Sequence, residues 1–221
     1  SRLTFNKEDD RYPSISPTGR EIALSRGRPN GNWDIIVSDG YNERTVLKGS
    51  QINLTSSQAW SPDGKRIMYT SNKDGVLSVY VINSDGSKPR RVIEDYGGQA
   101  AWSPDGKRIA YIKTLETAGN GELRIIDLET KKDRQITDAD NYAHPAWIGN
   151  EEIVVTEVLP YTAGCITTIN LITGEKERIT EPYDSNGTPG DPHGCFADWF
   201  PHPLGKGEFV FSRWDGDYFA L

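Results

Sequence analysis

The sequence predicts an all-β fold, a propeller built from four-stranded antiparallel blades. Three observations support this prediction: one motif recurs along the 221 residues, each copy reads as strand, turn and strand, and the copies are one blade length apart. The clearest copies occupy residues 59–70 and 101–112, and a less regular copy occupies residues 14–25. Pro and Gly recur inside the motif at fixed places, which excludes a helix.

Two weaker copies extend the repeat towards the C-terminus, at residues 146–155 and 198–211. The spacing is measured between anchor residues. The anchor of each copy is the residue that directly follows the central aromatic residue or its equivalent. Successive anchors lie 45, 42, 45 and 52 residues apart. They are Ser16, Ser61, Ser103, Ile148 and Phe200. Five copies predict five blades.

The turn of the motif has a sequence typical of a tight corner. In residues 103–106, Pro104 sets φ at the first turn position and Gly106 supplies a positive φ. Alternating apolar residues then begin the next strand. The Asp of each turn is interpreted as a residue that bonds the nearby backbone, not as a ligand.

Turn signals divide each repeat into short strands. In the first repeat the strands are 13–16, 21–26, 33–38 and about 43–47, and in the second they are 58–61, 66–71, 77–83 and 90–93. The third repeat has 100–103, 108–113, 122–128 and 134–137, and the fourth has 144–148, 152–158, 165–171 and 177–180. The fifth has only 196–200, 208–213 and 218–221. Four antiparallel strands in a unit of this length are typical of a propeller blade.

The two ends of the chain complement each other. Residues 1–5 match the outermost strand of a blade, like residues 134–137, but no strand precedes them. Pairing them with the fifth repeat completes four strands and removes two exposed edges. We therefore predict a closed ring of five blades with the N-terminal strand in the last blade. The alternative is a six-bladed propeller of which part is missing.

Composition and charge exclude several classes of function. A formal net charge of −7 and a pI near 5.1, without a basic cluster, argue against nucleic-acid binding. No apolar stretch is long enough to span a bilayer, and the N-terminus lacks the pattern of a signal peptide. Two cysteines are too few for a disulfide framework. Cys165 is predicted to be a small buried residue in a strand, and a bridge to Cys195 stays open.

The repeats resemble the PD40, or TolB-like, β-propeller repeat, also called WD40-like. The residues that carry the resemblance are 2–4, 79–87 and 103–111. The resemblance implies a single TolB-like propeller domain over residues 1–221, in a bacterial protein of the periplasm or the extracellular space. Such repeats occur in binding proteins, in the propellers of proteases and in oligogalacturonate lyases, so the function stays open. The hydrolase motif Gly-x-Ser-x-Gly is absent from the sequence.

Departures from the repeat gather on one face of the predicted propeller. Longer loops interrupt the pattern at residues 114–121, 159–164 and 181–195, which predicts a binding surface, with drift of tolerant surface loops as the alternative. The repeat alignment also predicts a ring of residues at the mouth of the central channel, where each innermost strand leaves its loop. These ring positions are Tyr12, Ser57, Gln99, His144 and Phe196.

Two hypotheses for the function follow. The first, which we favour, is a non-enzymatic, monomeric propeller without a cofactor, which binds a protein, peptide or glycan through the ring together with Asp191 and His193 of the long insert. The second, by resemblance to propeller lyases, is a metal-dependent polysaccharide lyase or hydrolase with His144 and His193 around a divalent metal. His202 is expected in the turn of the opposite face. A structural hydrogen bond beside Pro145 is the alternative role for His144.

Overall fold

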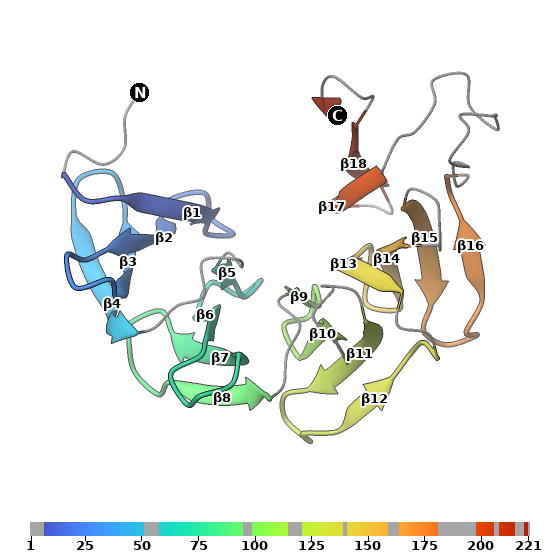
Figure 1. The fold of residues 1–221 in the computed structure, drawn as a ribbon, viewed down its shortest axis with the longest axis horizontal. Helices are drawn as coiled ribbons and strands as arrows, with labels where there is room; N and C mark the ends of the chain where they lie inside the picture. The colour runs from blue at the N-terminus through green and yellow to red at the C-terminus, as the bar shows by residue number, and fades with distance from the viewer. Residues whose placement is uncertain are drawn as a thin grey trace. The chain divides into compact units, whose positions relative to one another are not determined.

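The computed structural model describes residues 7–50, 58–94, 99–114, 121–138, 141–158, 164–180, 198–205, 208–214 and 219–220. Within this part of the chain every regular element is a β-strand (Figure 1), which confirms the prediction of an all-β fold. In the same residues there is no helix long and apolar enough to cross a membrane.

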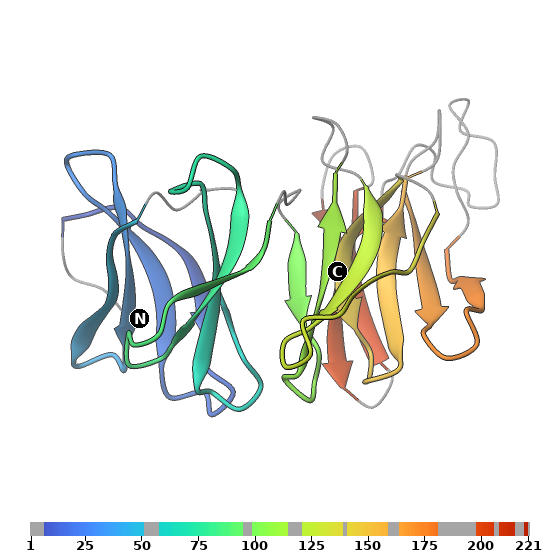
Figure 2. The same ribbon diagram turned by 90° about the horizontal axis from the view of Figure 1, so that it is seen from below.

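The described residues form five antiparallel sheets, which follow one another along the chain, and neighbouring strands in each sheet are consecutive in the sequence (Figures 1 and 2). The first sheet contains β1 (Asp10–Ile15), β2 (Ile22–Gly27), β3 (Trp33–Ser38) and β4 (Glu43–Ser50). The second contains β5 (Ala59–Trp60), β6 (Arg66–Ser71), β7 (Ser78–Asn83) and β8 (Arg90–Ile93). These two sheets belong to a first compact unit, Ser1–Gly98.

The remaining sheets belong to a second compact unit, Gln99–Leu221. The third sheet contains β9 (Ala100–Trp102), β10 (Arg108–Lys113), β11 (Glu122–Asp127) and β12 (Asp133–Gln135). The fourth contains β13 (Tyr142–Trp147), β14 (Glu152–Glu157), β15 (Cys165–Asn170) and β16 (Lys176–Arg178). The fifth contains β17 (Asp198–Gly205), β18 (Glu208–Trp214) and β19 (Phe219–Ala220).

The predicted division into blades is confirmed for the first four repeats, each of which forms one four-stranded sheet. The fifth sheet has three strands among the described residues. Residues 2–5, the predicted closing strand, lie outside the described part of the chain. The closure of the ring and the number of blades therefore stay predictions.

The turn of the motif forms as its sequence predicts. Ser103 Oγ donates to Asp105 Oδ1 at 2.6 Å, and the same carboxylate accepts the backbone N–H of Lys107 at 2.9 Å. Gly106 has a φ of 67°, a conformation that glycine adopts without strain. The second repeat has the same bonds around Asp63. The Asp residues of these turns are therefore occupied in holding the corner.

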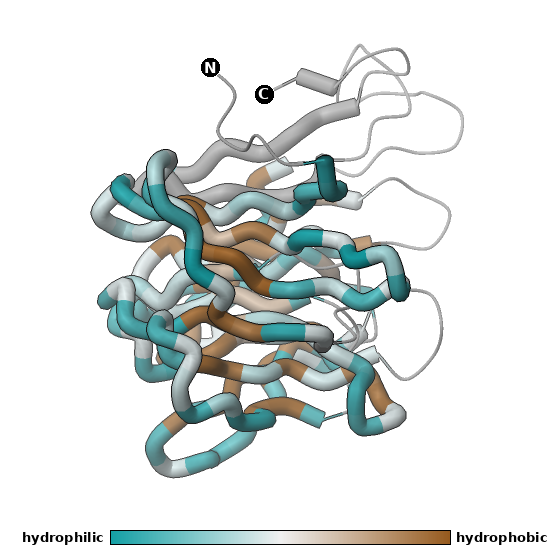
Figure 3. The backbone as a smooth tube through the Cα atoms, turned by 90° about the vertical axis from the view of Figure 1, so that its left-hand side faces the viewer, coloured by the Kyte–Doolittle hydropathy of each residue, from teal (hydrophilic) through white to brown (hydrophobic). Residues whose placement is uncertain are grey.

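Each unit has its own apolar core between adjacent sheets. In the first unit, Ala23 and Ile35 of the first sheet pack with Ile67 and Tyr69 of the second. In the second unit a cluster of the same kind includes residues of the third and fourth sheets. Figure 3 shows that apolar segments follow the strands, whereas hydrophilic residues occupy the turns.

A tryptophan on the innermost strand joins one sheet to the sheet before it. Trp60 Nε1 donates to the backbone oxygen of Ser14 at 3.1 Å, and Trp147 Nε1 donates to that of Ala101 at 3.1 Å. Both indoles are buried, and a buried indole N–H needs an acceptor. The recurrent tryptophan of the motif is therefore a contact between blades.

Candidate functional site

Two of the predicted ring residues, Tyr12 and His144, share an uncommon backbone conformation. Their φ angles are 53° and 50°, in the left-handed region that residues other than Gly seldom adopt. Each precedes a proline, Pro13 or Pro145, and a proline ring normally restricts the preceding residue to extended conformations. Two positions that the repeat alignment makes equivalent therefore have the same strained geometry.

A β-bulge accompanies this geometry in both strands. Two residues of β1 between Arg11 and Ser14 lie opposite one residue of β2, and the same shift occurs in β13 between Ala143 and Ala146. Proline is tolerated at a bulge, where the regular ladder is already interrupted. A residue in such a strained conformation costs about 1–3 kcal/mol, and such residues cluster at functional sites. The two bulges thus mark candidate binding positions.

Gln99 holds the bulge of β13 in place. Its side-chain Oε1 accepts a hydrogen bond from the backbone N–H of His144. Its own backbone oxygen accepts the N–H of Ile112 at 3.0 Å, so Gln99 extends the pairing of β9 with β10. Because Oε1 is the acceptor, the two N–H donors of the amide lie on the other branch of the side chain. The orientation of this amide is therefore set by His144.

His144 is half-buried and uncharged at neutral pH. Burial lowers its pKa from the ordinary value of 6.5 to about 4, because removal from water disfavours the charged form. A neutral imidazole offers one hydrogen-bond donor and one acceptor. His144 is therefore suited to a hydrogen bond with a polar group and does not attract an anion by charge at pH 7.

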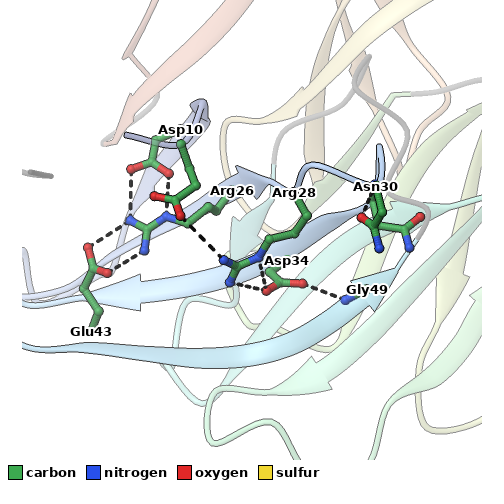
Figure 4. A network of polar contacts seen from close by, with 9 residues as sticks. Asp10, Arg26, Arg28, Asn30, Asp34, Glu43 and Gly49 are labelled. Carbon is green, nitrogen blue, oxygen red and sulfur yellow. Dashed lines mark hydrogen bonds and ion pairs between the residues drawn. The ribbon is translucent and has the colours of Figure 1, made fainter. Parts of the chain in front are cut away.

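A buried ion-pair network lies in the first unit (Figure 4). It includes the first residue of β1, the strand that contains Tyr12. The guanidinium of Arg26, which is 7% exposed, bonds Asp10 of β1 at 2.7 Å and Glu43 of β4 at 2.5 Å. These bonds raise the pKa of Arg26 and lower that of Glu43. Paired charges of opposite sign in a buried position hold their strands together because loss of one partner leaves the other uncompensated.

The fifth sheet corrects the alignment of the last repeat. The expectation that His202 lies in a turn is wrong, because His202 is part of β17 and pairs with β18. The register of β17 shifts between Trp199 and His202, as it does at the bulges of β1 and β13. Phe200 therefore has the register position of His144 and is not the anchor of the motif. One feature of the sequence indicates this register: Phe200 directly precedes a proline, Pro201, as the bulged residues of β1 and β13 do.

Four predicted site residues lie outside the part of the chain that the structure describes. They are Ser57, Asp191, His193 and Phe196. Most of the three long loops also lies outside it. Among the predicted site residues inside it, Gln99 and His144 are brought into contact, and Tyr12 belongs to the first unit.

The described residues contain no group of three His, Cys, Asp or Glu side chains arranged to hold a metal ion. The metal hypothesis therefore depends on Asp191 and His193, whose positions are not described. Cys165 is fully buried at the start of β15, as predicted, and its thiol is free. Burial raises the pKa of this thiol. Cys195 lies outside the described residues.

Comparison with known proteins identifies the repeat. A family model described as the TolB beta propeller domain matches residues 2–189. The chain is 30% identical over 86 residues to the Tol-Pal system protein TolB of Thioalkalivibrio sulfidiphilus, a match that covers 39% of this chain and 18% of that protein. It is 27% identical over 210 residues to dipeptidyl-peptidase 5 of Porphyromonas endodontalis, which covers 90% of this chain and 28% of that protein. The chain thus spans less than a third of these relatives.

Solved structures share the fold. A TolB structure from Agrobacterium tumefaciens has a TM-score of 0.73 and 21% identity, covering 99% of this chain and 74% of that chain. An oligogalacturonate lyase from Vibrio parahaemolyticus also has a TM-score of 0.73, with 14% identity and coverage of 98% and 62%. Identities this low show a common propeller fold and no more.

Proposed function

Because the chain belongs to the TolB beta propeller domain family, we propose that it is a non-enzymatic scaffold that binds a protein, peptide or glycan at its ring positions and irregular loop face. One observation carries this proposal: Tyr12 and His144, equivalent in the repeat, share a strained, half-buried conformation at a bulge. Strain of this kind persists only where the surrounding structure maintains it, and it is common in ligand clamps.

We propose that the protein meets its protein, peptide or glycan partner in the periplasm or the extracellular space, as the resemblance to TolB-like repeats implies. The matched TolB proteins are named as members of the Tol-Pal system. We also propose Ser57 of the second repeat, Asp191 and His193 of the long insert, and Phe196 as binding positions. We further propose that residues 1–221 act as one monomeric domain and that binding needs no cofactor.

Panning a phage-displayed random peptide library on the purified chain tests the proposal, with a glycan array in parallel. We expect labelled synthetic copies of the selected peptides to bind, and His144→Ala to weaken binding about tenfold, as expected for a central contact. Tyr41→Ala is the control, because Tyr41 is 96% exposed in the turn between β3 and β4. The proposal fails if no peptide or glycan binds, or if Tyr41→Ala is as damaging as His144→Ala.

A metal-dependent polysaccharide lyase or hydrolase is the second candidate. It is compatible with the fold, which an oligogalacturonate lyase shares. Of the two histidines that this candidate requires, the structure describes His144 but not His193. Metal analysis of the purified protein, followed by an assay on polygalacturonate with added manganese, tests this candidate. A stoichiometric metal and turnover that His144→Ala abolishes would favour it over the scaffold.

A further inference from the structure

Two turns meet at one end of the second sheet, here called its turn end. They connect β5 with β6 and β7 with β8, and the Ser84 N–H of the second turn donates to the backbone oxygen of Lys65 in the first at 2.8 Å. Arg44 of β4 donates to the backbone oxygen of Ser84 at 3.2 Å. A side chain at Gly86 would approach the backbone oxygen of Val46 in β4 to 2.7 Å. These contacts fix both turns against each other and against the first sheet.

Lys88, which follows in the second of these turns, has the same kind of strained backbone as Tyr12 and His144. Its φ is 56°, and it directly precedes Pro89, whose ring normally restricts the preceding residue to extended conformations. Lys88 is exposed, so burial of its side chain does not account for the strain. Residues in such conformations are common in ligand clamps. The strain at Lys88 therefore points to a ligand at the turn end.

The turn end also has an excess of positive charge. Lys65, Lys88 and Arg90 are exposed, and their side chains form no ion pair within the part of the chain that the structure describes. Asp85 is the carboxylate beside them, and it accepts the backbone N–H of Ser87 at 2.8 Å. Three cations and one carboxylate leave two positive charges here, in a chain whose net charge is −7.

The other charged groups around the turn end are paired or balanced within the first unit. In the first sheet Arg20 and Asp39 contribute one charge of each sign, and the carboxylate of Asp39 holds its own turn. The remaining groups are the pairs of Arg66 with Asp63, Arg91 with Glu94 and Arg44 with Glu21, and the group of Arg26 with Asp10 and Glu43, which has one negative charge. The positive excess is thus confined to the second sheet.

We propose that the turn end of the second sheet is a docking surface for an acidic segment of a partner protein, with Lys65, Lys88 and Arg90 as its contacts. Lysine and arginine side chains offer N–H donors and no acceptor, which matches carboxylates, because an ionised carboxylate only accepts. The turns follow the inner strand β5, whereas the predicted ring position precedes it. This surface is therefore additional to the proposed scaffold site and does not depend on it.

A short acidic segment fits this surface better than a nucleic acid or an anionic membrane. At physiological ionic strength a charge acts over only about 8 Å, so a short segment experiences the local positive charge. A long polyanion or a membrane also meets the rest of a chain that is negative overall. Residues 61–66 and 84–91 include no aromatic side chain on which a base could stack.

Fluorescence anisotropy with a labelled peptide of alternating Glu and Ser tests the proposal, and a Gln-Ser peptide of the same length is the neutral probe. We expect only the acidic peptide to bind, and Lys65→Glu/Lys88→Glu to raise its Kd about tenfold or more. Lys7→Glu/Lys48→Glu is the matched control, because it makes the same change in net charge on exposed residues of the first unit. The control should change Kd by less than about threefold, since screening weakens distant charges.

Substitution of Lys88 alone separates the role of its charge from its role in the fold. Glycine adopts a φ of 56° without strain, so Lys88→Gly should melt no lower than the wild type and yet bind the acidic peptide more weakly. Lys88→Arg keeps the charge and should bind like the wild type. A Lys88→Gly variant with unchanged affinity would show that Lys88 is not a contact.

Other results overturn the docking surface as a whole. These are an acidic peptide that does not bind, a neutral peptide that binds equally well, or equal losses of affinity in the two double variants. Tighter binding of a single-stranded oligonucleotide, or of vesicles that contain anionic lipid, would assign the surface to a different partner and contradict the proposal. The variants leave the ring positions unchanged, so failure here is distinct from failure of the scaffold function.

Discussion

Backbone strain distinguishes Tyr12 and His144 from Gln99, although the repeat alignment makes all three equivalent. Gln99 continues a regular strand, whereas the other two have a positive φ at a bulge. The hydrogen bond from His144 N–H to Gln99 Oε1 joins the two kinds of position. His144 therefore has a structural role through its backbone N–H.

The buried imidazole of His144 predicts a loss of stability in acid. Its folded pKa of about 4 lies below the ordinary value of 6.5, so the unfolded chain binds more protons between these two pH values. The contribution of His144 is complete above pH 6.5 and is lost as the pH falls towards 4, by up to roughly 1.4 kcal/mol per pH unit.

Denaturant unfolding of the wild type and His144→Asn at several pH values measures this effect. The carboxylates contribute equally to both proteins, so the difference between the two curves reports His144. An unchanged difference between pH 7 and pH 4.5 would show that the imidazole is not held neutral by burial.

At the scale of elements, the turn and the tryptophan of the motif make different kinds of contact. The Ser-Pro-Asp-Gly turn closes a corner within one blade through the bonds of Asp105 to Ser103 and Lys107. The tryptophan before it joins neighbouring blades, because Trp147 reaches Ala101 of the preceding sheet. The bonds of the turn lie within five residues of sequence, whereas the bond of the tryptophan joins two residues that are 46 positions apart.

Replacement of Gly106 by Val should destabilise the fold without changing the ligand affinity of the folded protein. A β-branched residue at a φ of 67° is strained by about 1 kcal/mol or more. Gly149→Val is the matched control, because Gly149 also lies in a turn, has no positive φ, and has open space where a side chain would begin. Thermal unfolding and anisotropy measure both variants, and selective loss of binding by Gly106→Val would contradict the structural role of the turn.

Trp147→Phe should lower the free energy of unfolding by about 1 kcal/mol, the contribution of one buried hydrogen bond. The substitution keeps an aromatic ring but removes the N–H that donates to the Ala101 oxygen. Denaturant midpoints of the two proteins provide the measurement. A variant as stable as the wild type would mean that the indole acts by packing alone.

At the scale of the whole molecule, the family match and the repeated sheets agree on a propeller. The predicted blades correspond to the observed sheets in the first four repeats. The fifth repeat was misaligned, since the predicted strand 196–200 is replaced by β17 at Asp198–Gly205. The long insert before β17 removed the regular spacing on which the alignment depended.

Deletion of residues 1–6 should lower the melting temperature if residues 2–5 supply the outer strand of the fifth sheet. That sheet would otherwise keep three strands and an exposed edge. Thermal unfolding of the truncated and full chains tests the prediction. Identical melting would contradict closure by this strand and favour the six-bladed arrangement.

The sequence alone determined the strands, the corners and the fold class, because Pro, Gly and Asp act on the backbone within a few residues of their own position. It also predicted that Tyr12, Gln99 and His144 occupy equivalent positions, since this follows from the repeat. Only the tertiary structure decided the bulges, the bond between Gln99 and His144, and the position of Phe200 in β17. These features depend on the pairing partners of each strand, which lie on other strands and in other blades. Register and inter-blade contacts are set by packing between distant segments, and local sequence preferences do not encode them.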